Sequence, residues 1–281
     1  MKKILKGFTL VELIVVMAIL VILMAGIMNM FKPIRETYVD ATLYESQRTV
    51  QNGVVQYVTE SVRYATDLGV YSTTGSTATS DVVSAVNNFT KAYLKANGVS
   101  DTDIADTAKY TTTKDAIKKN AEVIIIDNST AYSYNGENYT GRILRRKVDG
   151  TTAITSNAEV AGTSECRLAL GSAYYGESDL DVILTIKLDK DGSDYYGNAS
   201  EGIGINVAST TSYALRENFM EDSGTKLIKT AGLIQCRNLS DVGGLYDVDT
   251  AVTHDDSKPQ STGASGKIYI VYLNDKIDVV E

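Results

Sequence analysis

The sequence predicts an α+β protein in which one long N-terminal helix precedes a head built mostly of antiparallel strands. Two observations carry this prediction. Residues 8–31 are apolar apart from Thr9, Glu12 and Asn29. After residue 121 the chain consists of short runs rich in branched and aromatic residues, separated by Gly, Asn, Asp and Ser. The first pattern is typical of a helix that crosses a bilayer, and the second is typical of a sheet.

The apolar segment is long enough to span a membrane. Its 24 residues would rise roughly 36 Å as a helix, and a hydrocarbon core is about 30 Å thick. Lys2, Lys3 and Lys6 precede it, so we expect a single pass with the N-terminus in the cytoplasm. The alternative is a secretory signal peptide cut at Ala25. The length of the apolar core and the presence of Glu12 disfavour that alternative.

Glu12 is the most informative single residue of this segment. A carboxylate at the centre of a bilayer helix costs about 2.5 kcal/mol or more, so an acidic side chain in such a run indicates a function and requires a partner.

The stretch Gly7-Phe8-Thr9-Leu10-Val11-Glu12-Leu13 resembles the processing site of type IV prepilins and pseudopilins. The resemblance implies that a prepilin peptidase cuts after Gly7 and methylates the new N-terminus at Phe8. It also implies that Glu12 pairs with the Phe8 amine of a neighbouring subunit during assembly. The partners implied are other pilin subunits, the peptidase and the inner-membrane assembly machinery. The chain would lie in the cytoplasmic membrane before assembly and in a pilus or on the cell surface afterwards.

We expect four segments along the chain. Residues 1–7 would be the leader, 8–31 the transmembrane and assembly helix, 32–68 its amphipathic continuation and 69–281 the head. The continuation is predicted from helical spacing of apolar residues, and Pro33 is a candidate kink. The apolar positions are Val39, Leu43, Val50, Val54, Tyr57, Val58, Val62, Ala65 and Leu68.

Within the head, residues 69–121 are predicted as a loop and helical insertion and residues 122–281 as β-rich. Residues 69–80 read as a loop, 81–96 as a helix capped by Ser80 or Asp81, and 114–120 as a short helix. The predicted strands are 122–126, 131–134, 142–148, 166–170, 181–188, 202–208, 226–237 and 267–273.

The charge of the chain argues against a broad nucleic-acid surface. The formal net charge is −8, and it would be −11 without the three leader lysines. Such acidity repels phosphates. Arg142, Arg145, Arg146 and Lys147 form one basic cluster, which we interpret as an outward strand face or an intersubunit salt-bridge surface in preference to a DNA contact.

The two cysteines, Cys166 and Cys236, are predicted to form a disulfide. In an exported chain, two cysteines in strands favour a bridge over a metal or redox motif, and pilin heads often carry one.

No cofactor is required by the sequence, and calcium is the only candidate. Asp189, Asp191 and Asp194 could supply carboxylate oxygens, as some pseudopilins do in a calcium-bound loop. A second group comprises Asp247, Asp249, Asp255 and Asp256. Neither matches the EF-hand spacing, and a turn explains Asp191-Gly192 equally well.

No catalytic motif is present, and the single histidine, His254, lies in a polar loop. We therefore expect a structural subunit, not an enzyme. Its 274 residues after Gly7 favour a minor pilin or pseudopilin, and Glu60–Thr66 resembles helix ends of minor subunits of the J or W type. Adhesion, secretion, motility and DNA uptake remain open. The alternative is a membrane-anchored exported binding module or adhesin that does not polymerise.

Overall fold

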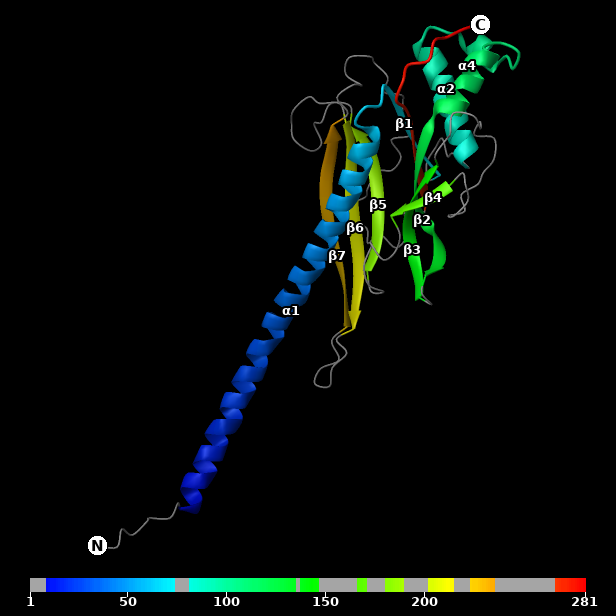
Figure 1. Ribbon diagram of the computed structural model, residues 1–281. Coiled ribbons are helices and arrows are strands. Elements are labelled where there is room, and N and C mark those ends of the chain that lie inside the picture. The colour runs from blue at the N-terminus through cyan, green and yellow to red at the C-terminus, as the bar shows by residue number, and fades with distance from the viewer. Residues whose placement is uncertain are drawn as a thin grey trace. The chain divides into compact units, whose positions relative to one another are not determined.

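The computed structural model describes residues 9–73, 81–134, 137–146, 166–170, 180–189, 202–214, 223–235 and 266–281. The chain divides into two compact units, Met1–Ser46 and Gln47–Glu281. The long helix α1 (Leu10–Val62) begins in the first unit and ends in the second (Figure 1). The fold is α+β, as predicted.

Helix α1 is continuous through Pro33, so this proline does not end it. The expected continuation to Leu68 is wrong, because α1 ends at Val62 and residues Asp67–Ser72 form strand β1. The backbone leaves the helix where the Thr66 N–H donates to the carbonyl oxygen of Leu273, 2.8 Å away. The loop expected at residues 69–80 therefore begins later than predicted, because β1 pairs with a strand about 200 residues away in the sequence.

Three helices follow β1. Helix α2 (Val82–Ala96) confirms the prediction, and the Asp81 side chain caps it by accepting a 2.8 Å hydrogen bond from the Ser84 N–H. Gly98 follows the helix with a φ of 85°, the left-handed conformation that often terminates helices. The short α3 (Asp101–Ala105) was not expected, and α4 (Thr111–Asn120) contains the predicted short helix.

The strands form two antiparallel sheets in the part of the chain that the structure describes, where the sequence suggested one. The larger sheet has the order β1-β8-β2-β3-β4, and the smaller has the order β5-β6-β7. Two expected strands, 131–134 and 122–126, belong to a single strand with a register shift between Asp127 and Ala131. The bounds are β2 (Glu122–Tyr134), β3 (Glu137–Arg146), β4 (Cys166–Leu170), β5 (Leu180–Asp189), β6 (Gly202–Ala214), β7 (Ser223–Gln235) and β8 (Lys267–Leu273).

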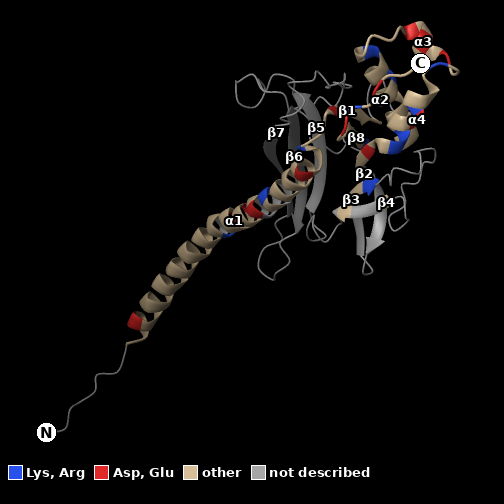
Figure 2. Ribbon diagram, turned by 45° about the horizontal axis from the view of Figure 1, so that its top comes forward, with Lys and Arg blue, Asp and Glu red and all other residues tan. Residues whose placement is uncertain are grey.

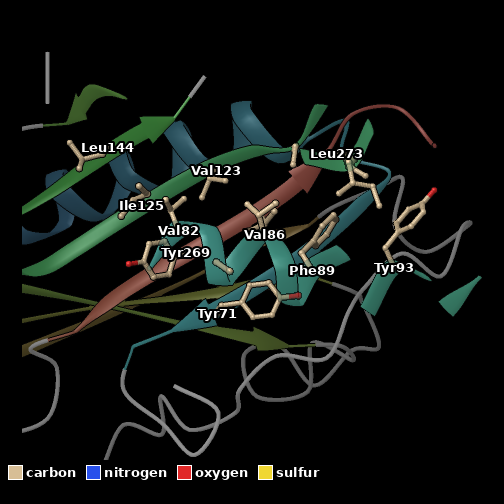
Figure 3. Packing of buried hydrophobic residues seen from close by; sticks show 14 of the residues in the cluster. Tyr71, Val82, Val86, Phe89, Tyr93, Val123, Ile125, Leu144, Tyr269 and Leu273 are labelled. Carbon is tan, nitrogen blue, oxygen red and sulfur yellow. The ribbon is translucent and has the colours of Figure 1, made fainter. Parts of the chain in front are cut away.

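The larger sheet is buried on both faces. One face joins α2 and α4 in a hydrophobic cluster that includes Tyr71, Phe89, Tyr93 and Tyr269 (Figure 3). The next residue along β8, Ile270, points to the opposite face and is fully buried as well. Coverage of both faces explains why β2 and β8 read as continuous apolar runs and not as alternating strands.

The end of α1 is buried in the head. Val54, Val58 and Val62 have no exposed surface, at spacings of four residues. Tyr57, on the same turns, lies near Arg145 of β3. Burial raises the pKa of Tyr57, and the positive charge of Arg145 opposes this rise. The predicted apolar stripe is therefore confirmed at these valines.

Candidate functional site

The start of α1 is held by a reciprocal pair of hydrogen bonds between Thr9 and Glu12. The Glu12 Oε2 atom accepts from the Thr9 N–H at 3.0 Å and from the Thr9 hydroxyl at 2.8 Å. The Glu12 N–H in turn donates to Thr9 Oγ1 at 3.3 Å. This is a capping box, in which an N-cap threonine and a glutamate three residues later satisfy the free N–H groups of a helix start.

The capping role of Glu12 was missed in the sequence, although the Thr-x-x-Glu spacing signals it. The residues predicted to flank the cleavage, Gly7 and Phe8, lie outside the described residues. The pairing of Glu12 with a neighbouring Phe8 amine stays a prediction. In the isolated chain the Glu12 carboxylate accepts hydrogen bonds from Thr9 at the start of the same helix.

The first part of α1 is apolar on all sides. The large apolar side chains from Leu10 to Ile34 that the structure describes are each 46–76% exposed, and Figure 2 shows a long uncharged run along the helix. Residues Leu10–Thr42 form a helix long and apolar enough to cross a membrane. A helix that is hydrophobic all round requires lipid or protein around it.

The basic cluster pairs with acidic residues inside the head. Arg142 contacts the Asp127 carboxylate with its Nε and Nη2 atoms at 3.2 and 3.1 Å, and the Asp127 side chain is only 1% exposed. Arg145 pairs with Glu122, and Arg146 is buried. Lys147 lies outside the described residues. Arg142 and Arg145 therefore form ion pairs within the head. The prediction of an outward strand face is wrong for Arg146, which is buried.

The Arg145 pair belongs to a small polar network on the face of the sheet that meets α1. The Tyr272 hydroxyl donates to Glu122 Oε2 at 2.8 Å, and the same oxygen accepts from Arg145. Burial, followed by the negative charge of Glu122, raises the pKa of Tyr272. Sequence reasoning missed this network because Glu122 and Tyr272 are 150 residues apart and meet only through the β2–β8 register.

The predicted disulfide and calcium residues lie mostly in parts of the chain that are not described. Cys166 is buried in the cluster under α2, whereas Cys236 is outside the described residues, so their pairing stays a prediction. Asp189 ends strand β5. Asp191, Asp194, the second acidic group (Asp247, Asp249, Asp255 and Asp256) and His254 are outside the described residues. Among the residues that are described, no group of three or more His, Cys, Asp or Glu side chains could hold a metal ion.

These features define an α+β chain with an N-terminal helix that could cross a membrane and a capped helix start. The family model of the prokaryotic N-terminal methylation motif matches residues 5–28. This range contains Gly7, Phe8 and Glu12, and the chain therefore carries the signal that the sequence suggested. Comparisons with curated proteins and with solved structures found no match.

Proposed function

We propose that the chain is the precursor of a type IV pilin-like filament subunit with a structural role. The observation that carries this proposal is the methylation motif at residues 5–28. The apolar, exposed first part of α1 supports it, because such a helix needs lipid before assembly and other helices after it. The size of the chain favours a minor pilin or pseudopilin over the abundant subunit.

In this proposal residues 1–7 are removed in the cytoplasm and residues 8–31 anchor the chain in the inner membrane. The head, residues 69–281, then lies outside and becomes the surface or tip of a pilus or pseudopilus. Glu12 changes partner during assembly. It leaves the Thr9 cap and pairs with the Phe8 amine of a neighbouring subunit, because a charge held in lipid is stabilised most by an opposite charge.

The first experiment tests processing. The full chain is produced with and without a prepilin peptidase, and its N-terminus is analysed by mass spectrometry. We expect loss of seven residues and a methylated Phe8. An intact leader in the presence of an active peptidase would defeat the proposal and favour the non-polymerising membrane-anchored module.

A second experiment separates the two roles of Glu12 in cells that make the filament. Glu12→Gln keeps an acceptor for Thr9, since glutamine also serves in capping boxes, but it removes the charge. Thr9→Val removes the capping hydroxyl and keeps the charge. We expect Glu12→Gln to be cleaved but absent from sheared filaments, and Thr9→Val to be incorporated. Incorporation of Glu12→Gln at the normal level would show that capping, not charge pairing, is the function of Glu12.

A further inference from the structure

The last described strand of the chain lies in the interior of the larger sheet. Strand β8 is placed between β1 and β2 and pairs antiparallel with both. Among the strands that the structure describes, β1 pairs with β8 alone. Their register runs without a break from Asp67↔Leu273 to Ser72↔Ile268. The first strand of the head therefore joins the sheet through residues that the ribosome makes last.

The side chains of β8 fill the core on both faces of this sheet. From Ile268 to Leu273 each residue is at most 3% exposed. Tyr269, Val271 and Leu273 belong to the hydrophobic cluster that includes residues of α2 and α4 (Figure 3). The alternate residues, Ile270 among them, point to the opposite face. Without β8, apolar side chains of β1, β2 and α2 lose part of their cover and face water.

Strand β8 also fixes the chain at both ends of β1. At the exit from α1, the Thr66 N–H donates to the Leu273 carbonyl oxygen at 2.8 Å. At the other end, the Thr73 N–H donates to the Lys267 carbonyl oxygen at 3.0 Å, and the Thr73 hydroxyl accepts from the Lys267 N–H at 2.7 Å. The junction between α1 and the head is thus set by a strand from the far end of the sequence.

The residues after β8 hold the helices that cover the sheet. Tyr93 of α2 forms hydrogen bonds with the backbone of Ile277, and Thr113 of α4 forms them with the backbone of Val280. Ile277 and Val279 are partly buried against the hydrophobic cluster. Residues 266–281, which we name the closing segment, therefore complete both the sheet and its helical cover.

We propose that the head stays open until the closing segment inserts between β1 and β2, so that insertion acts as a check on the completeness of the chain. Synthesis runs from the N-terminus, so β1 and β2 are both made before the strand that joins them. Pairing of distant segments also follows local structure, because closure of a long loop costs entropy before any contact is gained. A chain that stops before β8 carries an open head and lacks the bond that fixes the end of α1.

The test uses the full chain, made by cell-free synthesis with phospholipid nanodiscs and stalled on the ribosome through an added C-terminal spacer. A long spacer places residue 281 outside the ribosomal tunnel, and a short spacer keeps the closing segment inside it. Cys166 is the probe, because it is fully buried in the hydrophobic cluster. Cys236→Ser removes the other thiol of the chain.

Modification by a polyethylene glycol maleimide under reducing conditions is read as a shift on a gel. We expect Cys166 to react about tenfold faster or more with the short spacer than with the long one, because the open state is populated only in the first case. Lys119→Cys, an exposed position on α4, is added to the same chain as the internal control and should react rapidly with both spacers.

Two substitutions in the closing segment, made with the long spacer, connect the readout to its insertion. Tyr269→Asp places a charge in the core and should make Cys166 react rapidly. Lys276→Ala, at an exposed position, is the matched control and should leave Cys166 protected.

Two results would overturn the proposal. Slow reaction of Cys166 with both spacers would show that the head closes without residues 266–281, and rapid reaction with both would show that these residues do not close it. The readout involves neither leader cleavage nor a filament. Failure of this proposal would therefore leave the filament role intact, and the converse also holds.

Discussion

The hydroxyl of Tyr93 on α2 makes two hydrogen bonds to one residue of the C-terminal segment, Ile277. It donates to the Ile277 carbonyl oxygen and accepts from the Ile277 N–H at 3.1 Å. Thr113 on α4 makes the same pair of contacts to Val280, at 3.0 and 2.8 Å. The final residues, which have no regular secondary structure, are thus held on the helices by two side-chain hydroxyls that replace strand partners.

Replacement of Tyr93 by phenylalanine should release this segment. The change removes the Tyr93 hydroxyl from both the Ile277 N–H and the Ile277 carbonyl oxygen, and we expect a loss of about 1–2 kcal/mol in the free energy of unfolding. Hydrogen exchange of the Ile277 amide should also become faster. Tyr44→Phe, at an exposed position on α1, is the matched control. Unchanged exchange at Ile277 would contradict the role assigned to Tyr93.

Tyr71→Phe, in the same hydrophobic cluster, should change the free energy of unfolding in the opposite direction from Tyr93→Phe. The Tyr71 side chain is 7% exposed and its hydroxyl is buried without a hydrogen-bond partner among the described residues. Removal of an unsatisfied hydroxyl should leave stability unchanged or raise it by up to about 1 kcal/mol. Thermal unfolding of the two Tyr→Phe variants side by side checks this. A Tyr71→Phe chain that is less stable than Tyr93→Phe would refute it.

The Asp127–Arg142 pair should show strong coupling. Their side chains are 1% and 13% exposed, so Arg142→Met leaves a buried carboxylate without this partner and should cost about 3 kcal/mol or more. The double variant Asp127→Leu, Arg142→Met should recover most of this loss. Denaturant unfolding measures both. Lys95→Met, which breaks an exposed pair with Asp101, should cost less than about 1 kcal/mol.

Stability should fall on the alkaline side. Burial raises the pKa of Tyr71, Tyr93 and Tyr272 in the folded chain, whereas the unfolded chain ionises near the ordinary value of about 10. Below that pH both states hold the protons and stability is complete. As pH rises above about 10 the unfolded state loses protons first, so the free energy of unfolding decreases.

Circular dichroism melting curves from pH 9 upward measure this effect. The decrease should be shallower for Tyr71→Phe, because one raised pKa is removed. The same slope in Tyr71→Phe and the unchanged chain would contradict the assignment for Tyr71.

Elements with local signals were predicted well. Asp81 begins α2 through capping chemistry that depends on a few neighbouring residues, and the apolar spacing of Val54, Val58 and Val62 predicted the buried stripe of α1. Strands β4 and β8 were predicted with the bounds that the structure shows.

Elements that depend on distant partners were not predicted. Strand β1 was assigned to a helix end and a loop, because its residues become a strand only through pairing with β8. The polar network of Glu122, Arg145 and Tyr272 escaped notice for the same reason, since its members lie far apart in the sequence.

The sequence by itself determined that this chain begins with a membrane-length helix carrying a methylation motif and a single acidic residue, Glu12. Those features are contiguous, so residue order is enough to show them. Only the tertiary structure decided which residue Glu12 contacts in the isolated chain and which arginines are paired within the head. Hydrogen bonding and burial depend on which segments meet, and among the described residues hydrogen bonds join residues up to 207 positions apart.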